Sequence, residues 1–282
     1  MTSLFWRGLF ENMGTTLKFS SSFHPVTHRG RAVGIEFQRT KGPRKGEKLL
    51  LQTKKAVVSN ASVWDTASLL PDSELFSRQA TSTPKTDSFM HLHLGIKASG
   101  LPSDLECHHL VLNDWSIGIS APQNVCIVSI PSVFDPSLAP PGHHVVHAYT
   151  AGNEPYDIWR GMDHRSPEYA IQKEVRSEVL WRTLEKVIPD VRERVKVKLV
   201  GSPLTHERYL RRHEGTYGPA IKAGEMSFPG PYTSIPGLLC CGDSTMPGIG
   251  VPAVAASGLI AAHSLVPFWD HLRLLDSLEG AI

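Results

Sequence analysis

A carboxylate and two glycines follow a short apolar run near the end of the chain, and together they predict a ligand site. The run Leu238–Cys241 has the pattern of a buried strand, and Gly242 and Asp243 form a tight exit that places a carboxylate at the strand end. Gly248 and Gly250 let the backbone approach a ligand with no side chain between them. Asp243 would then accept hydrogen bonds from hydroxyl groups, such as those of a sugar or a ribityl chain.

A helix of small residues is predicted directly after these glycines, with Pro252 as its first residue. The first turn of a helix carries free N–H groups and the positive end of the helix dipole, which attract an electron-rich group. No acidic or basic residue lies between Asp243 and Asp270, so a membrane span has to be considered. Pro252 and Pro267 leave about 15 residues, or about 22 Å of helix, against a bilayer core of about 30 Å. We therefore expect a buried helix and not a membrane span.

Other residues that could do chemistry form less specific patterns. Cys107–His109 and the group His143, His144 and His147 match neither zinc-finger nor HExxH spacing. His144 and His147 would also point to opposite faces of a strand, so we predict surface or packing histidines and no metal site. The charges over 205–214 have helical spacing and fit a solvated helix face. No serine lies in a GxSxG context, so hydrolase chemistry has no support.

The elements that position the site start with a hairpin. Residues 31–38 alternate as a half-buried strand does and present three apolar side chains to one face: Val33, Ile35 and Phe37. The basic turn over 41–48 lacks the GxxxxGK[ST] order of a phosphate loop and is expected to be a hairpin tip. The return strand over 49–58 ends in an apolar run, which predicts burial on both faces. Asn60 follows it and begins a formal glycosylation sequon, but a position at the edge of a cofactor site is the preferred interpretation.

The middle of the chain is rich in predicted strands and contains one long helix. The strands are expected at 89–96, 124–130, 143–149 and 195–200. The helix begins at Pro167 after the N-cap Ser166, and Pro189 ends it. Its expected core face consists of Ile171, Val175, Val179, Leu184 and Ile188. These elements predict a mixed sheet with at least one packed helix.

The composition is that of an ordinary globular chain of 282 residues. Lys and Arg number 29 and Asp and Glu number 27, so the net charge of 29 − 27 = +2 gives no electrostatic reason to bind nucleic acid or an anionic membrane. Four cysteines without CxxC spacing fit a reducing compartment. No targeting signal is visible in the first residues.

Three segments resemble the motifs of one enzyme family in the same order. Pro236–Gly258 resembles the C-terminal flavin-binding motif of FAD-dependent amine-oxidase-like and phytoene-desaturase-like enzymes. Ala56–Asp65 is similar to a family strand that ends in an Asn-Ala pair near the cofactor, and Gly201–Gly218 to the motif that precedes the flavin segment. Within the family, the chain most resembles the carotenoid cis–trans isomerase group, also called prolycopene isomerase-like.

The resemblance implies which residues touch FAD and the substrate. The implied cofactor-binding residues are Asn60, Ala61, Gly242, Asp243, Gly248, Ile249, Gly250, Val251 and Pro252. Tyr217 and Gly218 would lie where the substrate channel meets the flavin. No residue is assigned a catalytic role, because the cofactor carries the chemistry in such enzymes.

The implied fold is α/β, the two-domain FAD/NAD(P)-binding flavoprotein fold. Family members begin with a strand and GxGxxG, which binds the FAD pyrophosphate, and this sequence contains no GxGxxG. We therefore expect the C-terminal half of such an enzyme, with an incomplete cofactor domain. The expected domains are an irregular segment 1–25, a discontinuous FAD-binding part 26–62 and 232–282, and a mixed-sheet substrate domain 63–231.

Three functional hypotheses follow. The first is an FAD-dependent oxidoreductase that acts on a polyene or a similar apolar substrate. The second is a truncated non-catalytic fragment or pseudoenzyme that cannot hold FAD, and the third is an amine oxidase. The expected partners are an apolar small molecule and no nucleic acid, with peripheral membrane contact in the parent enzyme and self-association through exposed apolar surface. The resemblance alone implies a plastid, and without it we expect the cytoplasm.

Overall fold

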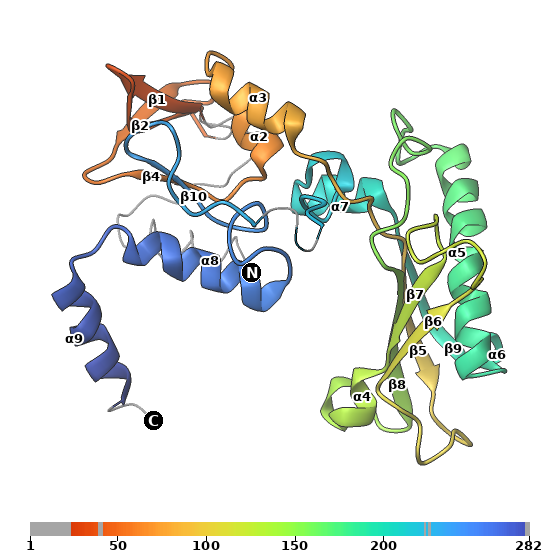
Figure 1. Ribbon diagram of the computed structural model, residues 1–282. Coiled ribbons are helices and arrows are strands. Elements are labelled where there is room, and N and C mark those ends of the chain that lie inside the picture. Colours follow the sequence, from red (N-terminus) through yellow and green to blue (C-terminus); the bar gives the residue numbers. More distant parts are fainter. Residues whose placement is uncertain (1–23, 39–41, 223, 225–226, 280–282) are drawn as a thin grey trace. The chain divides into compact units, whose positions relative to one another are not determined.

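The computed structural model describes residues 24–38, 42–222, 224 and 227–279, and the chain forms two compact units (Figure 1). Unit 1 comprises Met1–Ser82 and Ala223–Ile282, and unit 2 is the continuous segment Thr83–Lys222. Each unit has its own hydrophobic core.

The boundaries of the units differ from the predicted domain boundaries. The predicted substrate domain includes residues 63–82. In the structure, this segment forms α2 (Val63–Ser68) and α3 (Glu74–Ser82), which belong to unit 1. The reason is packing, because Phe76 joins Leu238 in one buried cluster. The assignment of one unit to FAD and the other to substrate stays a prediction. Most of the irregular segment predicted at 1–25 lies outside the described residues, and a strand already begins at His24.

Unit 1 contains two small sheets. The strands β1 (His24–His28), β2 (Arg31–Gln38) and β3 (Lys48–Gln52) form an antiparallel sheet in that order, which confirms the predicted hairpin. The single return strand predicted over 49–58 is wrong, because the chain leaves this sheet after Gln52 and a separate strand begins at Val57. The strands β4 (Val57–Ser59) and β10 (Leu238–Cys240) pair in parallel. The second sheet therefore joins two segments that are far apart in the sequence.

The buried face of β2 is not the predicted one. Ala32 and Gly34 are the buried residues, while the expected face of Val33, Ile35 and Phe37 is half-buried. The small residues are covered because other backbone lies close to them. The N–H of Ala32 donates to the carbonyl oxygen of Pro236 at 2.8 Å.

The helices near the C-terminus are more exposed than the sequence predicts. In α8 (Val251–His263), Ser257 and Ala261 are the buried residues, and Val251 is 78% exposed. The expectation of a buried helix is therefore wrong for this chain, since the described part of unit 1 packs against one face of α8 only. The next helix, α9 (Phe268–Glu279), also exposes large apolar side chains. Among the described helices, none combines the length and the apolar character needed to cross a bilayer.

Unit 2 is built on a five-stranded sheet with the order β6-β7-β8-β5-β9. Its strands are β5 (His91–Lys97), β6 (His108–Leu112), β7 (Val125–Ser129), β8 (His143–Thr150) and β9 (Val195–Gly201). The paired strands that the structure describes here all run antiparallel, so the predicted mixed sheet is wrong. The long connection between β8 and β9 carries the chain past β5, and both strands then pair with β5 in the antiparallel sense.

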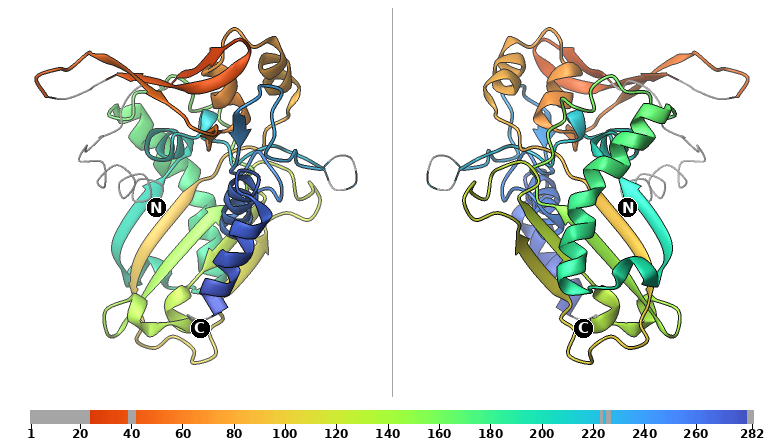
Figure 2. Two further views of the ribbon diagram at one scale, coloured as in Figure 1. Left: turned by 90° about the vertical axis from the view of Figure 1, so that its left-hand side faces the viewer. Right: turned by 90° about the vertical axis from the view of Figure 1, so that its right-hand side faces the viewer.

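The long helix α5 (Pro167–Val187) lies on one face of this sheet (Figures 1 and 2). It begins as predicted, because the hydroxyl of Ser166 accepts a hydrogen bond from the N–H of Tyr169 at 3.1 Å. The shorter helical elements of unit 2 are α4 (Pro131–Phe134), η1 (Pro136–Leu138), α6 (Val191–Arg194), α7 (Pro203–Leu210) and η2 (His213–Gly215).

The predicted core face of α5 is partly wrong. Leu184 is buried as expected, but Ile171 and Val175 are 64% and 63% exposed. The buried stripe is centred on Leu180, which contacts the sheet core. At 100° per residue, Ile171 lies about 180° around the helix from Leu180. Polar positions such as Ser177 occupy part of the buried stripe, so apolar spacing alone misplaces the face.

A buried ion pair also holds α5 to the loop after β8. Glu154 is fully buried, and the guanidinium of Arg176 donates to its two carboxylate oxygens at 2.9 and 2.8 Å. The indole N–H of Trp159 and the side-chain amide of Gln123 donate to the same carboxylate at 3.0 and 2.9 Å. Because all these donors converge on one carboxylate, the buried charge is well compensated.

Candidate functional site

The parallel pairing of β4 and β10 brings two of the predicted motifs to one sheet edge. The register pairs Leu238 with Val57 and Cys240 with Ser59. The pairing continues past the strands, since the N–H of Cys241 donates to the carbonyl oxygen of Ser59 at 2.9 Å. In parallel strands the carboxyl ends meet at one edge, the position where open α/β sheets bind ligands.

Asn60 and Gly242 lie in direct contact at this edge. Gly242 has φ +104°, and a Cβ atom at this position would lie 2.8 Å from the side-chain oxygen of Asn60. Glycine is therefore required both for the backbone conformation and for the close approach. The N–H of Gly242 donates to the hydroxyl of Ser257 at 2.7 Å, and this hydroxyl donates to the carbonyl oxygen of Val254 at 2.8 Å. The turn after β10 is thus fixed to α8.

Asp243 is buried directly after this turn, with 6% of its surface exposed. The hydroxyl of Ser244 donates to the Asp243 carboxylate at 3.2 Å and accepts from the N–H of Val63, at the start of α2, at 3.1 Å. Thr245 closes the turn by donating to the carbonyl oxygen of Gly242 at 3.0 Å. The carboxylate is therefore oriented by α2 and by its own turn, as a ligand-binding acceptor needs to be. Its contact with ribityl hydroxyls stays a prediction.

Gly248 and Gly250, in the loop that follows, differ in how closely other atoms approach them. Gly248 has φ +119°, and a Cβ atom there would lie 2.7 Å from the ring of Phe228. The space beside Gly248 is therefore occupied by an aromatic ring of the chain itself, and the approach of a ligand to Gly248 stays a prediction. Gly250 has φ +107°, and no atom of the described residues comes within 4 Å of a Cβ built on it. Between them, Ile249 is half-buried.

The start of α8 is open, as the helix-terminus prediction requires. Gly250 is its N-cap, and Val251 and Pro252 are exposed. The helix begins at Val251, one residue before the predicted start. The N–H of Val254 donates to the carbonyl oxygen of Gly250 at 2.9 Å, which marks the first helical hydrogen bond. Pro252 has no N–H, so the N–H groups of Val251 and Ala253 are those of the first turn that lack a partner within the helix.

Ala61 lines a pocket in unit 1. The pocket has a volume of about 40 Å³, and Ser244 and Thr245 are also among its lining residues. This volume suits a few water molecules. An isoalloxazine ring does not fit inside it, so a flavin at this edge would lie on the surface formed by these residues.

Tyr217 and Gly218, the predicted substrate-channel residues, belong to unit 2. The ring of Tyr217 packs edge-on against Phe89, with centroids 4.6 Å apart, and the guanidinium of Arg212 lies 5.7 Å from its centre. Gly218 is buried with φ +146°, and its carbonyl oxygen accepts from the N–H of Thr86 at 2.9 Å. The structure thus places Tyr217 in an aromatic cluster, and the position of Tyr217 and Gly218 beside a flavin stays a prediction.

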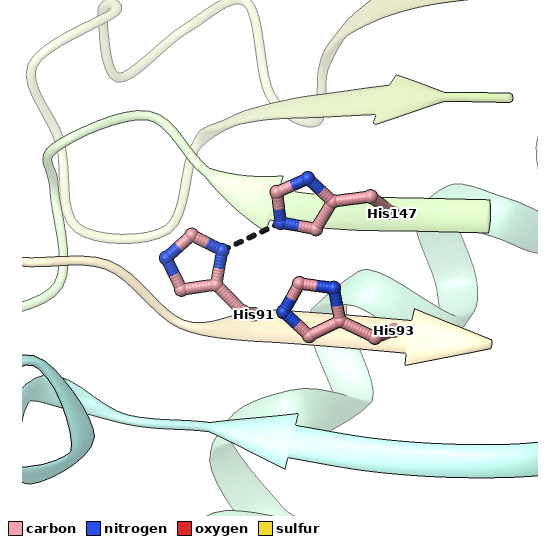
Figure 3. A group of neighbouring side chains, drawn as sticks. All are labelled: His91, His93 and His147. Atoms are coloured by element: carbon pink, nitrogen blue, oxygen red, sulfur yellow. Dashed lines mark hydrogen bonds between the residues drawn. The ribbon is translucent and has the colours of Figure 1, made fainter. Parts of the chain in front are cut away.

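A group of histidines extends this aromatic cluster along the face of the unit 2 sheet (Figure 3). His91 and His93 lie on β5 and His147 on β8, where His147 pairs directly with His93. Nδ1 of His91 and Nε2 of His147 are hydrogen-bonded at 2.7 Å. The ring of His206, from α7, lies 4.7 Å from the ring of His91. The strand expected at 89–96 is confirmed as β5, in which Leu92 is buried and lies on the face opposite His91 and His93.

Desolvation lowers the pKa of each of these histidines. Desolvation, with smaller contributions from the neighbouring imidazoles, lowers the pKa of His91 to about 2. Desolvation likewise lowers the pKa of His147 and of His206 to about 4, and it lowers the pKa of His93. The Arg212 guanidinium also lowers the pKa of His206. Residue spacing did not predict this cluster, because spacing along one strand says nothing about the register with the next strand.

No family model matches the chain. It is 37% identical over 280 residues to prolycopene isomerase 2, chloroplastic, of an Oncidium hybrid cultivar. It is 37% identical over 267 residues to prolycopene isomerase, chloroplastic, of Daucus carota. These alignments cover 96% and 91% of this chain but 46% and 41% of the relatives, so the chain spans less than half the length of the curated relatives it matches.

Among solved structures, the chain is similar to an oxidoreductase from Methanosarcina mazei, with a TM-score of 0.50 and 20% identity. The match covers 84% of this chain and 47% of that chain. This similarity concerns the fold, a mixture of helices and strands that corresponds to about half of the solved oxidoreductase. The sequence comparison is more specific than the structural one. The chain is homologous to the prolycopene isomerases over about nine-tenths of its length, which confirms the resemblance predicted from its motifs.

Proposed function

We propose that this chain forms the isoalloxazine- and ribityl-binding part of an FAD-dependent oxidoreductase that acts on a polyene or a similar apolar substrate. One observation supports the proposal most. The ends of β4 and β10 bring the Asn60–Ala61 pair beside the Gly242–Asp243 turn, and α8 begins nearby with an open first turn. Residues that the resemblance marks as cofactor-binding thus gather at one sheet edge. The homology to enzymes named prolycopene isomerases supports the substrate class.

The residues present fit one part of FAD. A buried carboxylate at Asp243 and open backbone at Gly250 suit a hydroxylated chain and the polar edge of a ring. The sequence contains no GxGxxG, so it lacks the backbone that would bind the pyrophosphate. When bound, FAD would supply the redox chemistry. The chain itself would orient the cofactor, with Asp243 accepting hydrogen bonds and the first turn of α8 donating them.

A second candidate is a non-catalytic fragment or pseudoenzyme. It is favoured by the missing GxGxxG and by the match to less than half of each relative. Phe228 over Gly248 also occupies a position that a cofactor could otherwise use. In this case the folded chain would serve as an interaction domain and would bind no flavin.

Titration of the purified chain with FAD and with riboflavin, followed by flavin fluorescence, separates these candidates. Riboflavin contains the isoalloxazine ring and the ribityl chain but no adenine diphosphate. We expect weak binding of both, with affinities within about tenfold of each other. A strong preference for FAD would contradict the incomplete site. The absence of saturable binding to either flavin would favour the fragment.

Asp243→Asn tests the role of the carboxylate in the same titration. Loss of a charged acceptor costs about 1.5–3 kcal/mol, so the affinity for riboflavin should fall at least tenfold. Asp72→Asn is the matched control, because Asp72 is exposed in the same unit, and it should leave the affinity unchanged. Unchanged affinity in Asp243→Asn would show that the carboxylate does not face the flavin.

The exposed apolar residues and the relatives support proposals about the partners of the chain and its location in the cell. Exposed Leu259, Phe268 and Trp269 on α8 and α9 support self-association, or contact with a membrane surface in the parent enzyme. The chloroplastic relatives support a plastid location. Size-exclusion chromatography with light scattering should show oligomers, and a monomer at all concentrations would contradict self-association.

A further inference from the structure

The face of the unit 2 sheet that carries His91, His93 and His147 gathers nitrogen ligands that the flavin proposal does not use (Figure 3). One ring nitrogen from each of the three histidines lies within 4.8 Å of the others. Figure 3 shows the rings side by side, with a nitrogen of each turned toward the space between them. We propose that these three histidines form a binding site for a divalent transition-metal ion of the Zn²⁺ type.

The backbone explains why three ligands meet here. His91 and His93 are two residues apart on β5, so both side chains point to the same face. His147 is the cross-strand partner of His93 on β8. Directly opposed side chains have Cβ atoms about 5 Å apart, which places a third imidazole next to the first two. A His-x-His strand with one histidine on the adjacent strand is thus a rigid source of three ligands.

The spacing is close to that of a metal site. In a tetrahedral zinc site with Zn–N distances of about 2.0–2.1 Å, neighbouring nitrogens are about 3.3 Å apart. The hydrogen-bonded nitrogens of His91 and His147 are 2.7 Å apart and would separate slightly. The widest nitrogen pair of the group would close by about 1.5 Å at most, a shift that imidazole rotation supplies. A metal ion would replace the proton that joins His91 to His147.

One nitrogen of the cluster is buried without a partner. Nε2 of His91 is inaccessible to solvent and makes no hydrogen bond among the described residues. With Nδ1 of His91 as the metal ligand, Nε2 would carry the remaining ring proton. His93 is exposed, so a fourth coordination position at this end would be open to water.

The ligand set selects the kind of metal. Three imidazoles suit Zn²⁺, Cu²⁺ or Ni²⁺, whereas Mg²⁺ and Ca²⁺ require oxygen ligands. The described group contains no carboxylate, and the Arg212 guanidinium lies close enough to act on His206. The site therefore carries no compensating negative charge. We expect moderate affinity and an ion that exchanges with chelators.

The test is a Zn²⁺ titration of the full chain, after removal of metal with EDTA, in competition with a chromophoric chelator. We expect one saturable equivalent of moderate affinity per chain for the wild type. His93→Gln should weaken this binding at least tenfold, and His147→Gln should do the same. His108→Gln is the matched control, because His108 is an exposed histidine on β6 of the same sheet. It should bind Zn²⁺ within twofold of the wild type.

Two further measurements keep the test decisive. Circular dichroism checks the fold of each variant, and exposed His93 can be replaced with little risk to the core. Co²⁺ should give the visible absorption of tetrahedral nitrogen ligation in the wild type but not in His93→Gln. Absence of saturable binding to the wild type would overturn the proposal. Equal losses in His93→Gln and His108→Gln would show that surface histidines bind the ion without a defined site, and would overturn it as well.

Discussion

The two units differ in how completely each buries its own apolar residues. In unit 2, α5 covers one face of the five-stranded sheet, and the core contains fully buried Leu92, Leu180 and Trp159. In unit 1, β4 and β10 form a two-stranded sheet, and α8 leaves much of its surface exposed. A two-stranded sheet needs further packing for stability. The comparison indicates that unit 2 is stabilised by its own core, whereas the unit with the candidate flavin site has an incomplete one.

The largest effect is expected when the buried ion pair of unit 2 is broken. Arg176→Met leaves the fully buried Glu154 carboxylate without its charged partner, and such losses cost about 3–5 kcal/mol. Urea denaturation should show this decrease in the free energy of unfolding. Lys198→Met, which breaks the exposed pair with Glu174, is the control and should cost less than about 1 kcal/mol. Similar losses in both variants would show that the Glu154 pair is not a main anchor of the unit.

Amide hydrogen exchange compares the two units directly. The amides of β5 should exchange at least about 100-fold more slowly than those of β10, because local opening is easier where fewer apolar contacts are lost. Riboflavin should increase protection at β10 and leave β5 unchanged if the proposed flavin site is present. Equal protection of β5 and β10 in the free chain would remove the contrast between the units.

Acidification should destabilise unit 2 through its neutral histidines. Because the folded pKa of His91 is about 2 and the unfolded value is 6.5, the unfolded state binds more protons between these values. The contribution of neutral His91 to the free energy of unfolding is therefore present above about pH 6.5, and it is lost progressively as the pH decreases. From pH 7 to pH 5, His91 alone contributes a loss of about 2 kcal/mol.

Urea denaturation of the metal-free chain across this pH range measures the effect. The neighbouring His93, His147 and His206 also titrate, and Arg212 adds positive charge, so the slope exceeds that of one group. His91→Gln should reduce the slope without abolishing it. A slope that His91→Gln leaves unchanged would show that His91 is not held neutral by the fold.

The smallest effect is expected on the outer face of α5. Val175→Gln should change the free energy of unfolding by less than about 0.5 kcal/mol, because Val175 is exposed. Leu184→Ala, on the buried face of the same helix, should cost about 2–5 kcal/mol. Thermal or urea denaturation measures both. A large loss in Val175→Gln would show that another surface covers this face in solution.

Much of the local structure was determined by the sequence alone. Strand patterns predicted β5 and β8, and Ser166 and Pro167 predicted the start of α5, since these signals arise from residues close together in the chain. The Gly242–Asp243 motif predicted the turn after β10, because its glycine has a left-handed φ angle that few other residues adopt.

Other features depend on contacts between segments far apart in the sequence, so only the tertiary structure decided them. The antiparallel sheet of unit 2, the exposed Val175 and the ring of Phe228 over Gly248 depend on which distant segments pack together. The contact of Asn60 with Gly242 arises from the parallel pairing of β4 with β10. The histidine cluster likewise depends on the register that sets His147 opposite His93. A shift of one residue in that register would turn His147 to the other face of the sheet, so no spacing along the chain could have predicted the site.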